Sequence, residues 1–287
     1  MTDGFLVVDK PSGRTSHDVV AEVRRAVGTR KVGHAGTLDP MATGVVVVAI
    51  GRCTRLIRFI QDQPKEYVAT ARFGVATDSL DADGVVTDMM EMDVDIARLR
   101  EIVEREFIGE IMQVPPMVSA LKQDGKRLYE LAREGIEVER PPRPVTVYEF
   151  EILAVSKGAT PDVSFRVVCG KGTYVRSLAN DLAGSLGGFA HLVSLRRTTT
   201  GGASVDDAIG LDALADWRDH LLGPNEVLSD RPEVLVDEPT ARDLRNGIRF
   251  ESPDLPEGWF RVCDPDGVFV AMCESRDGIA VPTVVFN

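Results

Sequence analysis

Residues 31–51 read KVGHAGTLDPMATGVVVVAIG, a glycine-containing loop followed by a continuous apolar run. The run Val45–Ile50 has no polar position, which predicts a strand buried on both faces inside a sheet. Pro40 favours an extended backbone at Asp39, and the glycines before it permit positive φ or close approach by another chain segment. A core has no need of a carboxylate here, so Asp39 is either an Asx-turn residue or a reactive group.

The loop fits none of the common phosphate-binding or protease patterns. No G-K-[ST] closes it as in a P-loop, and no G-x-G-x-x-G is present. An aspartic protease or an aspartate-based hydrolase would need a second carboxylate at a suitable distance, and the sequence identifies none. A lone carboxylate on a rigid loop suits a single nucleophile or a single base. His34 is either a hydrogen-bonded turn residue or part of the same site, and Arg30 and Lys31 beside it would suit phosphates.

The composition is that of a globular protein. At 287 residues the chain can hold one large domain, or a large one and a small one. No stretch approaches the roughly 20 apolar residues of a membrane span, and the N-terminus MTDGFLVVDK predicts a first strand rather than a signal peptide. We therefore expect a cytoplasmic protein with no membrane partner. The four cysteines form no C-x-x-C pair and the four histidines have no ligand spacing, so we expect buried thiols and no metal site.

The distribution of charge matters more than its sum. The net charge of −12 argues at first against a nucleic-acid partner. From Gly201 onward, however, 18 Asp and Glu face 7 Arg and no Lys, whereas the first 200 residues hold 27 acidic and 26 basic residues. Residues 10–65 are locally basic, so a phosphate-binding face can lie there.

The chain alternates predicted strands and helices. Strands are expected at 5–10, 45–50, 66–74, 145–155 and 163–169, and further helices at 95–107 and 175–186. Thr15 and Asp18 have the spacing of a capping box and predict a helix start. Residues 113–140 contain a Pro-Pro interruption and a short helix, and we expect them to pass over a surface cleft. Residues 221–232 indicate a linker, and 233–287 indicate short strands around one small helix.

Two further residues have a structural and a functional interpretation. Tyr67 is either a half-buried strand tyrosine or a ring that stacks on a base. Arg176 lies in the first turn of a predicted helix, where the helix dipole disfavours a cation. It is therefore either a surface arginine or the partner of a carboxylate or phosphate, and Asp39 is the partner we expect. Arg196 and Arg197 indicate a solvated pair or a phosphate contact.

Several stretches occur together in the order and spacing of a known family. They are DKPSGRTSHDVV, GHAGTLDPMATGVVVVAIG, KEYVATARFG, TDSLDADG, QVPPMVSALKQDGKRLYELAREG, CGKGTYVRSLANDLA and HLVSLRRTTTG. Over about residues 4–202 the chain resembles the TruB family of tRNA pseudouridine synthases, and its tail resembles the small PUA-like domain of bacterial members. The resemblance implies an α+β fold: a mixed, mostly antiparallel central sheet flanked by helices and crossed by a cleft, plus a small C-terminal β-rich PUA-like domain. We place the catalytic domain at 1–225, with a flap at about 113–140, and the PUA-like domain at 226–287.

The resemblance also implies roles for individual residues. Asp39 would be the catalytic aspartate that attacks the target nucleotide, and His34 would occupy the space vacated by flipped bases. The residues implied around the target uracil are Tyr67, which would stack on it, Tyr174 and Leu195, which would line its pocket, and Arg176, which would pair with Asp39. Contacts with RNA phosphates are expected from Lys10, Arg30 and Lys31, and from Lys122, Lys126, Arg127 and Arg133 of the flap.

The expected function is that of a tRNA pseudouridine-55 synthase. It would isomerise uridine 55 in the T-loop of the tRNA TΨC arm by base flipping, without metal or cofactor, and as a monomer by default. One alternative is an RNA-binding or tRNA-folding protein on the same scaffold, which the intact Asp39, Tyr67 and Arg176 disfavour. Another is a guide-RNA-dependent relative that acts on ribosomal RNA, which the complete flap and the tail disfavour. The isomerisation transfers no electrons or groups, in agreement with the absence of a dinucleotide motif.

Overall fold

The computed structural model describes residues 2–119, 121–123, 125–136 and 138–287. Its main sheet has nine strands in the order β1-β3-β12-β4-β11-β10-β7, with β2 paired to β3 and β13 paired to β12. The strands of this sheet are β1 (Gly4–Lys10), β2 (Val32–His34), β3 (Thr43–Ile50), β4 (Lys65–Phe73), β7 (Gly109–Gln113), β10 (Arg143–Val155), β11 (Asp162–Cys169), β12 (Ala190–Thr200) and β13 (Ala203–Ser204). Among the described strands of this sheet, only β3 and β12 pair in parallel, so the predicted mixed, mostly antiparallel sheet is confirmed.

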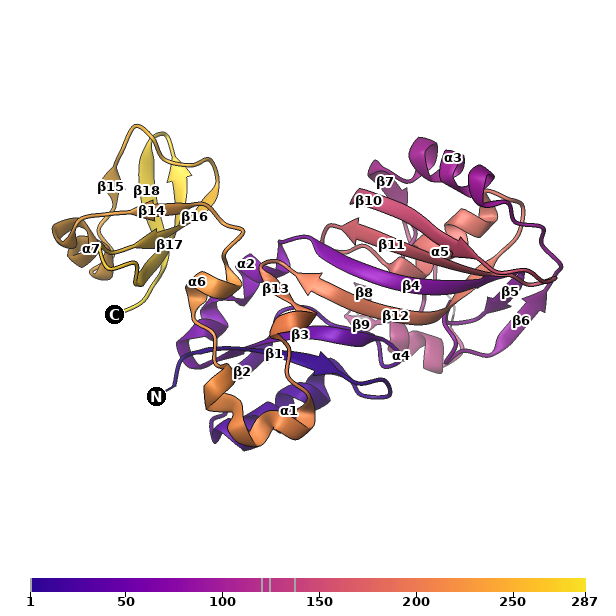
Figure 1. Ribbon diagram of the computed structural model, residues 1–287, viewed down its shortest axis with the longest axis horizontal. Coiled ribbons are helices and arrows are strands. Elements are labelled where there is room, and N and C mark those ends of the chain that lie inside the picture. The colour runs from indigo at the N-terminus through magenta and orange to yellow at the C-terminus, as the bar shows by residue number, and fades with distance from the viewer. Residues whose placement is uncertain (1, 120, 124, 137) are drawn as a thin grey trace.

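Helices and two small hairpins surround this sheet (Figure 1). The helices are α1 (Ser16–Val27), α2 (Ile57–Gln61), α3 (Ile96–Glu106), α4 (Leu128–Arg133), α5 (Val175–Gly184) and α6 (Pro224–Val227), with 3-10 helices η1 (Gly51–Leu56), η2 (Val205–Asp207) and η3 (Leu211–His220). The hairpins are β5 (Val75–Thr77) with β6 (Val86–Met89), and β8 (Lys122–Gln123) with β9 (Lys126–Arg127). Helix α3 packs against β10, and α5 packs against β12.

Strand β3 separates two hydrophobic cores. Val46 packs in one core together with Val19 and Val23 of α1. The next residue, Val47, points into the second core, which it shares with Phe59 of α2. Every residue from Gly44 to Ile50 is buried, because alternate side chains of a strand point to opposite faces and both faces are covered here. The predicted interior strand is confirmed, and the Asp39 loop ends on a strand that is buried on both faces.

Helix α1 begins as the sequence predicts. Thr15 is its N-cap, and Thr15 and Asp18 form a reciprocal capping box. The helix ends at Gly28, whose φ of 72° is left-handed, a conformation that glycine adopts without a steric penalty. This short, well-capped helix places its N-terminal turn beside the loop that carries Asp39.

A second sheet lies at one end of the molecule, next to α2 and α6 (Figure 1). Its strands, in the order β14-β16-β17-β18-β15, are β14 (Glu233–Leu235), β16 (Trp259–Cys263), β17 (Phe269–Arg276), β18 (Ile279–Val285) and β15 (Phe250–Glu251). Helix α7 (Glu238–Arg245) buries Ala241 and Leu244 in the core of this sheet. The predicted C-terminal unit of short strands around one helix is confirmed.

The stretch predicted as a linker, residues 221–232, is a packed connection instead. It contains α6, and the side chains of Val227 and Leu228 are completely buried in the second core. The same core contains Met272 of the C-terminal sheet, and the rings of Phe59 and Trp259 pack edge to face with centroids 5.0 Å apart. The linker interpretation failed because isolated apolar residues between Gly, Pro and Asp do not reveal a buried partner. The proposed boundary between residues 225 and 226 falls inside α6.

The predicted flap consists of the β8–β9 hairpin and α4. Leu128 and Leu131 of α4 are buried, as the apolar spacing predicts. The side chains of Lys122, Arg127 and Arg133 lie outside the described part of the structure. Among the described residues, no helix combines the length and the hydrophobicity needed to cross a membrane.

Candidate functional site

The loop between β2 and β3 holds Asp39 by anchors on both sides of it. Before Asp39, the backbone N–H of Leu38 donates to Oγ of Ser16, at the first residue of α1, over 2.9 Å. After Asp39, the carbonyl oxygen of Pro40 accepts a hydrogen bond from Nζ of Lys10 at 3.1 Å. These contacts leave the backbone at Asp39 little freedom, as a reactive side chain requires.

Asp39 faces an arginine at the start of α5. Nε of Arg176 lies 2.9 Å from Oδ2 of Asp39, which confirms the predicted ion pair. The Arg176 side chain is only 2% exposed, whereas that of Asp39 is 33% exposed. Arg176 also donates to the carbonyl oxygens of Ser79 and Val118, each at 2.8 Å. The guanidinium is therefore fixed within the protein, while one side of the carboxylate stays accessible to another molecule.

Asp81 is a member of this site that sequence reasoning missed. Its side chain is 7% exposed, and Oδ2 lies 3.5 Å from Nη1 of Arg176. The preceding residue, Leu80, has a φ of 61°, an uncommon value for a non-glycine residue. Its stretch, TDSLDADG, reads as an acidic surface turn, and nothing in the residue types separates Asp81 from its neighbours. Only its position in the family motif could have identified it.

The protonation of Asp39 reflects these neighbours. Burial raises the pKa of Asp39, and the negative charge of Asp81 raises it further, while Arg176 and Lys10 favour the carboxylate and lower it. The net effect is a pKa above the usual value for aspartate. The ionised form, which can act as nucleophile or base, is therefore the main form only above this raised pKa.

Two tyrosines lie within the electrostatic reach of Asp39. Burial raises the pKa of the Tyr67 and Tyr174 hydroxyls, and the charge of Asp39 adds to the rise at both. Tyr67 lies on β4 with 9% of its surface exposed, and Tyr174 precedes α5, where its N–H donates to Oε1 of Gln113 over 2.8 Å. Leu195 on β12 is buried in the same core as Tyr67. The structure thus places the side chains predicted around a uracil on the strands and the helix that surround Asp39.

His34 lies at the end of β2, where its ring packs edge to face against His17. The ring centroids are 5.2 Å apart with an interplanar angle of 78°. Burial lowers the pKa of His34, and the charges of His17 and Arg197 lower it further. His34 is therefore neutral at pH 7, which suits a residue that fills space better than one that binds phosphate.

Lys10, predicted as a phosphate contact, has a different role. Its side chain is completely buried, and Nζ donates to the carbonyl oxygens of Pro11, Arg14 and Pro40 at 3.0, 2.6 and 3.1 Å. An ammonium group has three donors, so none remains for a phosphate. Burial lowers the pKa of Lys10 to about 8. The prediction failed because the sequence does not reveal the long-range carbonyl at Pro40.

The other basic residues differ in their surroundings. Arg30 and Lys31 are exposed in the turn before β2. Lys126 of the flap pairs with Glu134 at 3.3 Å, and both side chains are about half exposed, so the pair is weak enough to exchange for a phosphate. Arg196 pairs with Asp9 and is partly exposed, but Arg197 is 1% exposed, so neither a solvated pair nor a phosphate contact describes it.

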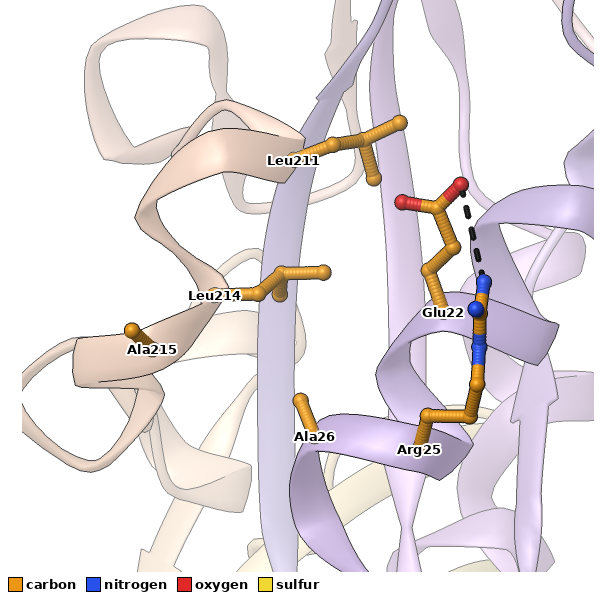
Figure 2. Close-up of a pocket in the computed structure, with 6 residues that line it drawn as sticks. All are labelled: Glu22, Arg25, Ala26, Leu211, Leu214 and Ala215. Atoms are coloured by element: carbon orange, nitrogen blue, oxygen red, sulfur yellow. Dashed lines mark ion pairs between the residues drawn. The ribbon is translucent and has the colours of Figure 1, made fainter.

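Two surface hollows described by the structure lie away from Asp39. Figure 2 shows one between α1 and η3, where Glu22 and Arg25, 3.9 Å apart, face Leu211 and Leu214. The other lies between the two sheets beside Arg52. Neither is lined by Asp39, so the cleft implied by the family resemblance stays a prediction.

No group of three or more His, Cys, Asp or Glu in the described part of the chain could hold a metal ion. All four cysteines are free and buried, as the sequence predicts: Cys53, Cys169, Cys263 and Cys273. Burial raises the pKa of their thiols to about 11 or 12. They are therefore unreactive thiols at neutral pH.

Comparison with known proteins gives matches in both parts of the chain. Residues 24–175 match the model of the TruB family pseudouridylate synthase N-terminal domain, and residues 232–287 match that of the tRNA pseudouridine synthase II C-terminal domain. A tRNA pseudouridine synthase B of Thermobifida fusca is 44% identical over 292 residues, covering 100% of this chain and 99% of the relative. That of Geotalea uraniireducens is 46% identical over 256 residues, covering 86% and 80%.

Solved structures agree with the sequence matches. A chain of a Cbf5-Nop10-Gar1 complex superimposes with a TM-score of 0.76 at 26% identity, covering 99% of this chain and 84% of that one. A chain of an H/ACA ribonucleoprotein bound to a substrate RNA containing 2′-deoxyuridine gives 0.74 at 25% identity, covering 99% and 85%. With a family model over more than half of its length and near-complete relatives above 40% identity, the chain belongs to the TruB family of pseudouridylate synthases.

Proposed function

We propose that this protein isomerises uridine 55 in the T-loop of tRNA to pseudouridine, with Asp39 as its catalytic residue. The observation that carries the proposal is the contact between Asp39 and Arg176, in which a partly exposed carboxylate faces a fixed, buried guanidinium at 2.9 Å. The names of the relatives, tRNA pseudouridine synthase B, support tRNA as the substrate class.

The reaction balances within one nucleotide. The N1–C1′ bond of uridine breaks, the uracil turns, and a C5–C1′ bond forms. The proton of C5 is lost and N1 gains a proton, so no electrons enter or leave. One carboxylate can start this sequence by attacking C1′ or C6, or by removing a proton from C2′, and the three routes remain alternatives.

The electrostatics of the site fit such a role. Arg176 favours the ionised form of Asp39, which each of the three routes requires, although burial and Asp81 keep its pKa raised. A raised pKa also makes the carboxylate a better proton acceptor than a solvated aspartate would be. The ionised form of Asp39, paired with Arg176, is the form that can react.

The target base must leave the tRNA loop before it can reach Asp39. Extruding a stacked nucleotide costs a few kcal/mol, which stacking in the site and a filler residue can offset. We assign the filler role to the neutral His34, the stacking role to Tyr67, and the walls of the uracil pocket to Tyr174 and Leu195. Because Tyr67 is mostly buried in the free protein, it would offer the base one exposed edge or face after a small adjustment.

The T-arm stem-loop of tRNA is the partner that we propose. Arg30 and Lys31, which are exposed in the turn before β2, and Lys126 of the flap would contact its phosphates. Lys122 and Arg127 are kept in this proposal from the sequence, since their side chains lie outside the described residues. We infer a monomer that acts in the cytoplasm, where tRNA is processed.

Release of tritium from tRNA tests the proposal. A tRNA transcript carrying 5-tritiated uridine is incubated with the protein and with Asp39→Asn, because forming the C5–C1′ bond expels the label from C5. We expect stoichiometric release with the unmodified protein and none with Asp39→Asn, which should bind the transcript equally well. No release from a tightly bound transcript would favour the tRNA-folding alternative or another RNA target, and release by Asp39→Asn would refute the role of Asp39.

A further inference from the structure

Arg197, on β12, is one of the largest completely buried side chains of the protein. Its guanidinium donates two hydrogen bonds, from Nε to the carbonyl oxygen of Val45 at 2.8 Å and from Nη2 to that of Gly36 at 3.1 Å. Both acceptors are backbone atoms. A buried cation bound to carbonyls is expensive to desolvate, so its retention needs a local reason.

The two carbonyls lie on either side of Asp39. Gly36 begins the loop that carries Asp39, with a φ of 121°, and Val45 is the first completely buried valine of β3 beyond that loop. A single guanidinium therefore closes the base of the loop. Lys10 binds the same loop at the carbonyl oxygen of Pro40, so two buried cations bind the loop at separate points.

The backbone of Arg197 fixes the same region. Arg197 pairs with Gly44 in the short parallel contact between β12 and β3. A Cβ atom at Gly44, whose φ is 100°, would lie 2.1 Å from the carbonyl oxygen of Arg197. Gly44 is thus required for the close approach that brings the Arg197 side chain under the loop.

Arg197 also faces Tyr67. The two residues are directly paired in the antiparallel register of β12 and β4, which places their side chains on the same face of the sheet. Although burial raises the pKa of the Tyr67 hydroxyl, Arg197 is the largest influence in the opposite direction, so the two groups are close. One buried cation thus binds the loop of the carboxylate and lies beside the tyrosine assigned to stack on the target base.

We propose that Arg197 is a positioning residue that fixes the distance between the Asp39 loop and Tyr67, and so aligns the carboxylate with the base held by the ring. The inference rests on the proposed function of Asp39. It does not make Arg197 a catalytic residue, since Arg197 acts through Gly36, Val45 and Tyr67.

The test compares Arg197→Met, Arg197→Lys and a control, Arg261→Met. Arg261 is also buried, but it lies on β16 of the C-terminal sheet, where it pairs with Glu233 at 2.9 Å. Three quantities are measured on the full chain: the single-turnover rate of tritium release from the tRNA transcript, the dissociation constant of that tRNA, and hydrogen–deuterium exchange of residues 33–42 without RNA.

For Arg197→Met we expect the single-turnover rate to fall about 100-fold, the scale of a misplaced reacting group, with a dissociation constant within about threefold of the original. In this variant, hydrogen–deuterium exchange should rise in residues 33–42 and stay unchanged in β16 and β17. Arg197→Lys should regain about tenfold in rate, because an ammonium can bind loop carbonyls, as Lys10 does. Arg261→Met should keep the original rate.

Any of three results would overturn the inference: an unchanged rate in Arg197→Met, a rate loss matched by the loss of affinity, or exchange that rises equally throughout the chain. If Arg197→Met fails to fold, Arg197→Lys is measured in its place: a rate about tenfold below the original with raised exchange in residues 33–42 would support the inference, and an original rate with original loop exchange would overturn it. If Asp39→Asn keeps its turnover, the proposed role of Asp39 fails, whereas exchange of residues 33–42 still decides whether Arg197 holds the loop.

Discussion

The main sheet and the C-terminal sheet use arginine in different ways. Around the main sheet, Arg176 and Arg197 are almost completely buried, and their donors reach backbone carbonyls of distant loops. In the C-terminal part, Arg245 and Arg261 form ion pairs with Asp264 and Glu233, and Arg261 also donates to the carbonyl oxygen of Arg231 and to Oδ1 of Asn225. Of these four arginines, Arg176 and Arg197 bind the loop that carries Asp39, whereas Arg245 and Arg261 bind residues of the C-terminal part and of the connection before it. The difference locates the chemistry on the main sheet.

Of the changes considered, Arg176→Met should have the largest effect on the reaction rate and on stability. In Arg176→Met, Asp39 and Asp81 lose the cation between them, and we expect the single-turnover rate to fall on the order of 10³-fold. The free energy of unfolding should fall by about 3 kcal/mol, because the buried Asp81 is left uncompensated. Urea unfolding and tritium release measure the two quantities. Arg245→Met serves as the control from the C-terminal sheet, and a rate loss as large in that variant would remove the contrast.

Neutralising Asp81 should shift the dependence of the reaction on pH. Burial and the charge of Asp81 raise the pKa of Asp39, and the ionised form reacts, so activity is lost as the pH falls through that raised pKa. In Asp81→Asn the like charge is gone, so the pKa of Asp39 falls and the acidic limb of the pH–rate profile moves to lower pH. Single-turnover rates from about pH 4, near the usual pKa of aspartate, to about pH 8 would measure the shift. An acidic limb that stays in place or moves to higher pH would contradict the assignment of Asp39 as the titrating group.

The salt dependence of tRNA binding shows which part of the protein contacts phosphates. Replacing both Arg30 and Lys31 by Ala should weaken tRNA binding severalfold and reduce the slope of log K against log salt by about 0.7–0.9 for each lost phosphate contact. The matched double variant replaces Arg242 and Arg249, which are exposed on the acidic C-terminal part, and should leave the slope unchanged. Filter binding over a range of salt concentrations measures the slope for each variant. An equal decrease in slope in the two double variants would mean that the C-terminal part carries phosphate contacts as well.

The smallest expected effect is on stability alone. Thr15→Ala removes the oxygen that accepts the Asp18 N–H at the start of α1, and should lower the free energy of unfolding by about 1 kcal/mol. The rate of a single turnover should stay the same, because Ser16, which holds Leu38, is retained. Urea unfolding together with tritium release separates the two, and a large loss of rate would mean that the cap itself sets the position of the Asp39 loop.

Much of the fold could be predicted from local pattern. The apolar run of β3, the capping box of α1 and the strand-rich tail each depend on residues close together in sequence. The pairing of Arg176 with Asp39 was also predictable, because a cation at the start of a helix opposes the helix dipole and so indicates an anionic partner.

The errors at the site concern charged residues whose partners are distant in sequence. Lys10 binds the carbonyl of Pro40, and Arg197 binds that of Gly36, and a carbonyl has no signature in the residue types. Asp81 stands among other acidic residues that stay at the surface. Sequence patterns identify where a charge occurs, but they do not reveal whether a carbonyl of another segment meets it.

The shared second core has a consequence for how the chain would be degraded. Met272 and Val284 of the C-terminal sheet pack there with Phe5 of β1 and Val47 of β3. Val227, close to the connection between the two parts, is completely buried, so a protease gains access only when this core opens. Cleavage in this connection would expose the face of β3 that packs in the second core. We therefore expect resistance to limited proteolysis and loss of activity to follow one unfolding equilibrium, with no active, truncated N-terminal fragment accumulating.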